Sequence, residues 1–343
     1  MSISSRFNSI VRFYQLLKRE KILRLLIVIA ILVFVGSFGV TYFEKNTTFL
    51  NALWWSFVTL TTVGYGDIAP VTLGGRIIGI IMMFFGIGVL GLFTATIASI
   101  FVNRKFKEER GMFKTDVKDH FVICGWNHRA SEIVHSLRVD PHGKRKPIVL
   151  LADIDTKPVE DEDIYFIQGE VTEENLNRAN IKEAKTVIIL LDDRLDVYTR
   201  DAKAILNTLT VESMNPDVYT CVELVNSENI EHCKRARADE VIVGEEFSSK
   251  LLTQAAINHG ITMVISEILS KKYGSNLYKV TIPDFLKSES FVNALTLLKR
   301  DYNCLIVAVQ SSSKDVFMTN PSADYIMQNG DQIILISDRR PEF

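Results

Sequence analysis

The chain contains few cysteines, and its charges are unevenly distributed. The first part has few acidic residues, and in the remainder basic residues are fewer than acidic ones. The 343 residues include four cysteines, and none forms a Cys-x-x-Cys pair. We interpret them as reduced thiols of a protein whose soluble part faces the cytosol. Residues 1–116 contain 13 basic and 6 acidic side chains, whereas residues 117–343 contain 26 basic and 35 acidic ones. A basic first part followed by an acidic remainder argues against nucleic acid as a partner.

Two stretches are almost free of charge. Ile22–Phe43 has only Arg24 near its start, and Ile77–Val102 has no charged residue. About 20 apolar residues cover a hydrocarbon core of roughly 30 Å, so both stretches are predicted to span a membrane. The first lies too late in the chain and is too long for the apolar region of a signal peptide.

Positive residues flank the outer ends of the two spans. The stretch between the spans has only Lys45 and Arg76, whereas ten basic residues lie at or beyond the outer ends of the spans: Arg6, Arg12, Lys18, Arg19, Lys21, Arg24, Arg104, Lys105, Lys107 and Arg110. This asymmetry predicts that both termini are cytoplasmic and that the protein lies in the cell inner (plasma) membrane. Everything after residue 104 is then expected inside the cell.

A short apolar element lies between the spans. Asn51–Thr62, "NALWWSFVTLTT", is too short to cross a membrane as a helix and predicts a re-entrant pore helix. A glycine-rich stretch follows it, and irregular backbone survives at membrane depth only where protein buries it or where it lines a water-filled cavity. Gly64 and Gly66 can adopt left-handed angles that turn successive carbonyls the same way. Rings of such carbonyls can replace the hydration shell of a cation.

Thr62-Val63-Gly64-Tyr65-Gly66 is the string TVGYG of the potassium-channel selectivity filter, and the sequence resembles that family. The resemblance implies a homotetramer around a central axis, with K+ held by the main-chain carbonyls of Thr62, Val63, Gly64 and Tyr65 and by the Thr62 hydroxyl. The two-span layout lacks the extra helices and the arginine-rich segment that voltage sensing needs.

Residues next to the filter have expected roles as well. Asp67 would add negative potential at the outer mouth. Trp54 and Trp55 are candidates for the pore-helix aromatics that hold Tyr65, and interfacial belt residues are the alternative reading of both. In the second span, Gly86 is predicted to be the gating hinge, with close helix packing as the alternative.

Residues 1–20 carry apolar side chains at three- and four-residue steps among basic residues. This pattern predicts an amphipathic helix in contact with membrane lipid, or else a disordered tail. The pore domain is expected over residues 21–103, and a charged connector over residues 104–118.

The soluble half alternates apolar strands with helical stretches, which predicts a Rossmann-like, doubly wound parallel sheet over residues 119–245. In its first turn, Gly125, Asn127 and Ala130 occupy the glycine places of G-x-G-x-x-G, so only the first glycine is intact. Asp153 ends the second strand, where it could accept from ribose hydroxyls, and Asp155 is a rival for that role. Nucleotide binding and a turn kept only for folding both remain open.

The order of domains and the stretches "CGW", "LLAD" and "QGEVTEENLNRANIKEAKTVIIL" resemble the RCK (regulator of potassium conductance) domain. The resemblance places Glu170 at the adenosine side of a bound nucleotide and implies NAD or an adenine nucleotide as ligand. Ca2+ is the family's other ligand class, and three acidic clusters offer carboxylates: Glu160–Asp163, Glu170 with Glu173 and Glu174, and Asp192 with Asp193 and Asp196. A solvated face is the alternative for each cluster.

The resemblance also covers the rest of the chain. Residues 246–274 are expected to form crossover helices for dimerisation, broken near Gly260, and residues 275–343 a small α+β lobe. An eight-copy RCK ring is implied, and Met112 could supply extra copies through an internal start or be an ordinary linker methionine.

The predicted function is a ligand-gated, potassium-selective channel that is not an enzyme. A membrane-anchored oxidoreductase would need a catalytic His, Tyr/Lys or Cys set, and none is evident. A regulatory subunit of a potassium transporter would not normally have its own TVGYG. The sign of gating and the identity of the ligand stay open.

Overall fold

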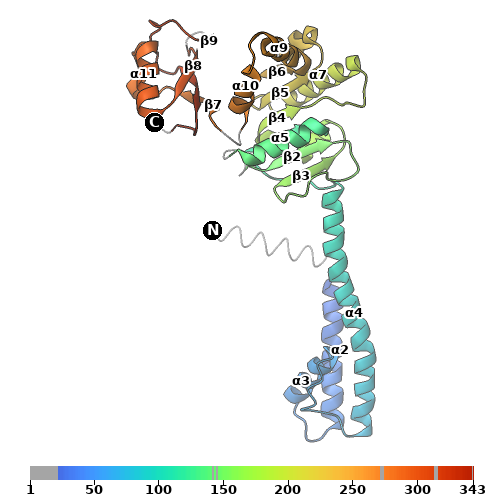
Figure 1. The fold of residues 1–343 in the computed structure, drawn as a ribbon. Helices are drawn as coiled ribbons and strands as arrows, with labels where there is room; N and C mark the ends of the chain where they lie inside the picture. The colour runs from blue at the N-terminus through green and yellow to red at the C-terminus, as the bar shows by residue number, and fades with distance from the viewer. Residues whose placement is uncertain (1–21, 141–142, 144–145, 271–273, 313–315, 342) are drawn as a thin grey trace. The chain divides into compact units, whose positions relative to one another are not determined.

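The computed structural model describes residues 22–140, 143, 146–270, 274–312, 316–341 and 343. The chain separates into two compact units, and the boundary in the sequence falls between Glu109 and Arg110 (Figure 1). The amphipathic helix expected over residues 1–20 lies outside the described residues.

Three helices build the first unit: α2 (Ile22–Phe43), α3 (Phe49–Leu60) and α4 (Leu73–Glu109). Both α2 and α4 are long and apolar enough to cross a membrane, whereas α3 is not. The bounds of α2 coincide with those expected, but α4 extends beyond Ile77–Val102 at both ends. Its last turns contain the helix formers arginine, lysine and glutamate, and Lys105 pairs with Glu109 one turn later at 3.8 Å. The start of the expected connector is therefore helical.

Small residues set the packing of this unit. A Cβ atom on Gly36 of α2 would lie 2.6 Å from the Met82 sulfur of α4, so the Met82 side chain would have to move to admit one. Ser37, which is fully buried, donates to the Val33 carbonyl at 2.6 Å and lies 3.2 Å from the Ser56 hydroxyl of α3. α2 is thus joined to α4 by close contact and to α3 by a polar contact.

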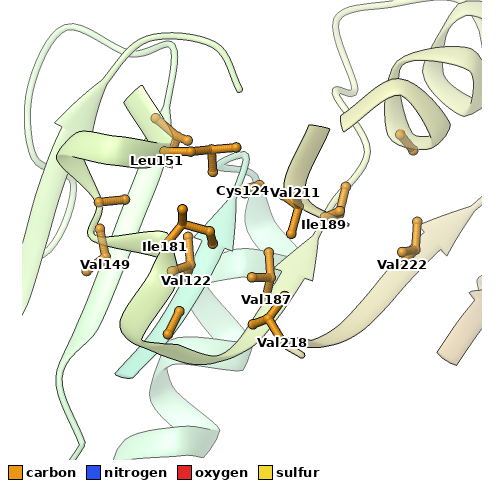
Figure 2. Packing of buried hydrophobic residues seen from close by; sticks show 14 of the residues in the cluster. Val122, Cys124, Val149, Leu151, Ile181, Val187, Ile189, Val211, Val218 and Val222 are labelled. Carbon is orange, nitrogen blue, oxygen red and sulfur yellow. The ribbon is translucent and has the colours of Figure 1, made fainter. Parts of the chain in front are cut away.

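Six parallel strands form the main sheet of the second unit, in the order β3-β2-β1-β4-β5-β6. They are β1 (His120–Cys124), β2 (Ile148–Ala152), β3 (Ile164–Gln168), β4 (Ala184–Ile189), β5 (Tyr219–Leu224) and β6 (Glu240–Val243). Every residue of β2 is buried, as expected for a parallel strand whose two faces are covered. Figure 2 shows Val122, Val149 and Val187 of three neighbouring strands within one apolar core.

Helices and short 3-10 turns connect the strands: α5 (His128–Val139), α6 (Glu173–Arg178), η1 (Ile181–Glu183), α7 (Val197–Met214), η2 (Ser227–Asn229) and α8 (Ile230–Arg235). Polar side chains start the longer ones. Asn127 accepts from the Ala130 amide at the start of α5, and Asp196 accepts from the Thr199 amide at the start of α7. These caps fix where each helix leaves the carboxyl edge of the sheet.

Two further helices follow the sheet, α9 (Gly244–Ile257) and α10 (Ile261–Leu269). The break between them lies at Gly260, whose φ of 91° is a left-handed angle that favours glycine. Neither helix has a buried residue, and large apolar side chains such as Leu252 and Met263 are exposed. The chain thus presents a broad apolar helical surface here.

The last part of the chain is a small α+β lobe. Its antiparallel sheet has the order β7-β10-β8-β9, formed by β7 (Asn276–Thr281), β8 (Leu305–Gln310), β9 (Phe317–Thr319) and β10 (Gln332–Ser337). The 3-10 turn η3 (Asp284–Leu286) and helix α11 (Phe291–Tyr302) complete it, and Leu286, Leu298 and Leu335 lie in its core. The predicted fold class is confirmed: apolar helices, then a Rossmann-like parallel sheet and a small lobe.

Candidate functional site

The loop after α3 has an alternating backbone. Thr62, Gly64 and Gly66 have φ angles of 61°, 57° and 76°, whereas Val63 and Tyr65 between them are not left-handed. The amides of Val63 and Gly64 both donate to the Val58 carbonyl, at 3.0 and 3.3 Å, which ties the loop to the end of α3. Left-handed angles at Gly64 and Gly66 were expected. Thr62 was not expected to share them, because threonine rarely adopts this region.

Trp54 of α3 supports the loop in two ways. Its ring stacks on Tyr65 with the ring centroids 6.0 Å apart and 6° between the planes. Its indole Nε1 donates to Asp67 Oδ2 at 2.9 Å. Trp55 is buried with Val40 and Ala52, and it lines a cavity that Thr62, Gly64 and Gly66 also line. The two tryptophans that the sequence could not tell apart therefore have different surroundings.

A buried carboxylate that the sequence analysis missed lies beside this loop. Glu44, just after α2, accepts hydrogen bonds from the Val71 amide at 2.9 Å, the Thr72 amide at 2.9 Å and the Thr72 hydroxyl at 2.8 Å. The Thr72 hydroxyl in turn accepts from the Gly75 amide at the start of α4. Glu44 thus joins the end of α2 to the start of α4. The sequence signal that could have identified Glu44 is its position as an acidic residue directly after an apolar span.

Gly86 lies on the buried side of α4, which is helical without a break at this position. A Cβ atom there would lie 3.2 Å from Leu60 Cδ1 at the end of α3, whereas one on Gly88 or Gly91 would meet nothing within 4 Å. Gly86 is therefore the place where α4 approaches the pore helix. This contact fits close packing, and a hinge at Gly86 remains a proposal.

A cavity opens at the carboxyl edge of the parallel sheet, beside the first turn. Gly125, with a φ of 101°, begins the turn. Asn127, Asp153 and Glu170 line the cavity together with Gly125, but Asp155 is not among the described residues that line it. The structure thus brings together four of the five residues predicted for nucleotide binding.

Three cations that the sequence analysis missed also line this cavity: Arg194, Arg200 and Lys203. Arg194 donates to both oxygens of Asp192, at 2.8 and 2.9 Å, and lies 3.6 Å from Asp153. Lys203 of α7 donates to Glu170 at 2.8 Å and to Asp192 at 3.0 Å. Nothing in the sequence sets these cations apart, and only the folded structure shows that they line one cavity.

The ion pairs perturb the acid–base properties of this cavity. The hydrogen bond from Arg194, and then that from Lys203, hold the pKa of Asp192 well below its usual range despite partial burial. For Lys203, partial burial opposes the charge, but hydrogen bonds to Glu170 and Asp192 raise its pKa nonetheless. Burial raises the pKa of the Cys124 thiol in the cavity wall to about 12, so it is not a thiolate nucleophile at neutral pH.

The acidic clusters are largely committed to partners within the protein. Asp161 pairs with Arg138 at 2.7 Å, Asp193 pairs with Arg129 at 2.7 Å, and Asp196 caps α7. Among the residues that the structure describes, no group of three or more His, Cys, Asp or Glu side chains is placed to hold a metal ion.

Three family models match successive parts of the chain. Residues 25–103 match an ion channel family, and residues 116–222 match the calcium-activated potassium channel slowpoke-like RCK domain. The chain combines an ion channel domain with an RCK domain. Residues 245–342 match the Castor and Pollux family, described as part of a voltage-gated ion channel. The combination of pore and RCK domain predicted from the sequence is confirmed.

Curated relatives match this chain over nearly their whole length. The calcium-gated potassium channel TvoK of Thermoplasma volcanium is 28% identical over 98% of this chain and 97% of its own. Potassium channel protein 1 of Methanocaldococcus jannaschii is 26% identical over 92% of this chain and 93% of its own. These relatives are channels rather than enzymes, and the channel family places the protein in a membrane.

Among solved structures, the human SLO3 gating ring is similar to the RCK domain. The TM-score is 0.52 at 17% identity, and the match covers 65% of this chain and 44% of that one. At this identity the likeness shows the fold alone.

Proposed function

We propose that four copies of this chain form a potassium-selective pore whose opening depends on a ligand of the RCK domain. The backbone of Thr62–Gly66 is the observation that carries the proposal. Its alternating left-handed angles turn successive carbonyls the same way, as a chain of dehydrating K+ sites requires. Trp54 holds this loop through the Tyr65 ring and the Asp67 carboxylate. In this arrangement Asp67 adds negative potential at the outer mouth.

The surface of a single copy supports assembly in a membrane. Filter residues Val63 and Tyr65 are 54% and 68% exposed. Many large apolar side chains of α2 and α4 are exposed as well. One filter loop cannot enclose an ion, so copies must surround a common axis. Lipid and neighbouring copies then cover the apolar helices. Basic residues outside both spans support a cytoplasmic location for the two termini.

The exposed faces of α9 and α10 support pairing between RCK domains. Leu252, Ile257 and Met263 are 70%, 69% and 76% exposed, which is unusual for a soluble helical surface. We propose that these helices cross to a second copy, and that such pairs build an eight-copy ring. Translation from Met112 would supply the copies that lack a pore.

The cavity at the sheet edge is the proposed ligand site. Asp153 lines the cavity and would accept from ribose hydroxyls, and Arg194 and Lys203 are among the cations there that could bind phosphate oxygens. An adenine nucleotide or NAD is therefore our proposed ligand. TvoK is calcium-gated by name, and Ca2+ is the second ligand to test. A ligand shifts gating only by its difference in affinity for the open and closed states.

The test is K+ efflux from liposomes that contain the purified full-length protein, with Na+ as the control ion. We expect K+ flux to exceed Na+ flux and to change when ADP or NAD is added. A response to Ca2+ alone would move the sensor to the carboxylate clusters. Equal K+ and Na+ flux under every condition would contradict the proposed pore.

A further inference from the structure

A doubly wound sheet can hold a dinucleotide because its crevice has two mononucleotide-binding halves. The ligand lies across the point where the strand order reverses. In this RCK domain the reversal falls between β1 and β4, with β2 and β3 on one side and β5 and β6 on the other. Both halves must be open and connected to hold a dinucleotide.

An arginine spans that reversal point. Arg129, in the first turn of α5, places Nη2 2.7 Å from Asp193 Oδ1 and Nε 2.8 Å from Glu223 Oε1. Asp193 follows β4, and Glu223 lies in β5. Arg200 lies 3.7 Å from the Asp193 carboxylate and donates to the Asp193 main-chain carbonyl at 2.8 Å, so Asp193 is held in place by Arg200 as well as by Arg129. We call this set of ion pairs the Arg129 bridge.

The Arg129 bridge separates two cavities. Asp193 lines the first, which also contains Asp153 and Glu170 on the β2–β3 side. Arg129 and Glu223 line the second, which extends to Gly244 at the start of α9. Leu191 and Arg200 line both, so the wall between the cavities is made of these two residues and the ion pair.

Asn127 restricts the same crevice from the side of the first turn. It stands at the second glycine place, where backbone otherwise approaches a pyrophosphate. Its Oδ1 accepts a hydrogen bond from the Ala130 amide at 3.0 Å, and its Nδ2 donates to the Leu191 carbonyl at 3.0 Å. Arg200, which also lines the first cavity, donates to the carbonyls of Leu195 and Asp193, so a phosphate there is left with Arg194 and Lys203 as its cations.

We infer that the RCK cavity takes a single nucleotide, a ribonucleoside mono- or diphosphate, and that the Arg129 bridge excludes the second half of a dinucleotide. The inference rests on the nucleotide-binding part of the proposed function and narrows its ligand class. Asp153 binds the ribose, and Arg194 and Lys203 exchange carboxylate partners for phosphate oxygens. The second nucleotide of NAD would need the space that Arg129 occupies.

The test is isothermal titration of the full-length protein in detergent with ADP and with NAD. We expect ADP to bind the unaltered protein at least about tenfold more tightly, a difference of about 1.4 kcal/mol. Arg129→Ala should reduce this ratio at least about threefold, or about 0.6 kcal/mol. The double variant R129A/N127G, which opens both restrictions, should reduce it further.

Lys118→Ala is the matched control. Lys118 forms an exposed ion pair with Glu183 at 3.2 Å in the same domain, and its loss should leave the ratio unchanged. Thermal melting of each variant separates altered specificity from misfolding. Equal affinity of the unaltered protein for ADP and NAD, or a ratio that the double variant does not change, would overturn the inference. Binding of neither nucleotide would overturn it together with the nucleotide site, whereas the K+ flux experiment tests the pore separately.

Discussion

The loop of Thr62–Gly66 depends on individual side chains outside it. Trp54 contacts the loop through both its ring and its N–H, and Glu44 fixes the chain where α4 begins. The sequence predicted the filter because glycine spacing is local information. It left Trp54 and Trp55 equivalent and gave Glu44 no role, because these roles depend on contacts between helices.

Trp54→Phe separates the stack on Tyr65 from the hydrogen bond to Asp67. Phenylalanine keeps an aromatic ring against Tyr65 but has no donor for the carboxylate. We expect K+ flux per channel to change several-fold while the melting temperature stays near that of the unaltered protein. Trp55→Phe, which alters a buried ring that packs with Val40 and Ala52 and leaves the Trp54 contacts to Tyr65 and Asp67 in place, should lower the melting temperature and leave selectivity intact. If both variants show the same K+ flux, the different roles assigned to Trp54 and Trp55 are wrong.

Glu44→Ala leaves three donors at the start of α4 without their acceptor. Because unsatisfied buried donors destabilise the folded state, we expect a melting temperature lower by several degrees and less tetramer in detergent. Glu44→Gln keeps one acceptor oxygen of the same reach and should lower the melting temperature and the amount of tetramer less. The measurement is thermal melting followed by size-exclusion chromatography. Glu44→Ala with unchanged stability and assembly would argue against the tie between α2 and α4.

At the scale of elements, the order and type of the helices and strands could be predicted from sequence, but the contacts at their ends could not. The strand–helix order, the membrane spans and the break at Gly260 could be predicted because periodicity and glycine placement are local. The Arg129 bridge could not, because Arg129 and Asp193 are 64 positions apart and meet only through the order of strands in the sheet. Asn127 was noticed as a departure from the glycine pattern, but its cap on α5 and its bond to Leu191 emerge only from the fold.

The glycines of α4 allow hinge and packing to be distinguished. A methyl group on Gly86 would lie 3.2 Å from Leu60 Cδ1, whereas one on Gly88 would meet nothing within 4 Å. If Gly86 is a hinge, Gly86→Ala should reduce opening several-fold in single-channel recordings with little change in melting temperature. If it serves packing alone, the melting temperature should fall instead. Gly88→Ala is the control and should change neither quantity.

For the whole molecule, a buried histidine links folding to pH. His120 is fully buried at the start of β1; its Nε2 lies 3.0 Å from the Ala179 carbonyl, and its Nδ1 has no partner in the described part of the chain. Burial lowers the pKa of His120, more than the Ala179 carbonyl and Asp119 raise it. The unfolded chain therefore binds the proton more readily than the folded one does.

The sign of the pH dependence follows from that difference. The contribution of His120 to stability is fully present above the unfolded pKa of about 6.5 and is lost as pH falls through the lower folded pKa. We expect the melting temperature of the RCK transition to fall between neutral and mildly acidic pH. His120→Gln, which keeps a donor for the Ala179 carbonyl but does not titrate, should flatten this part of the profile. An equally steep profile in the variant would assign the effect to other groups.

α4 continues as helix to Glu109, and two residues later Gly111 is already bound to the end of β3. Its carbonyl accepts from the Gln168 amide at 3.2 Å and from Arg178. Only Arg110 therefore separates the end of α4 from the first bond to β3. Each residue inserted before Glu109 would turn the end of the helix by about 100° and lengthen the helix by about 1.5 Å. Ligand response should then vary periodically with the number of inserted alanines and return near a full turn, whereas a flexible tether would lose it steadily with length.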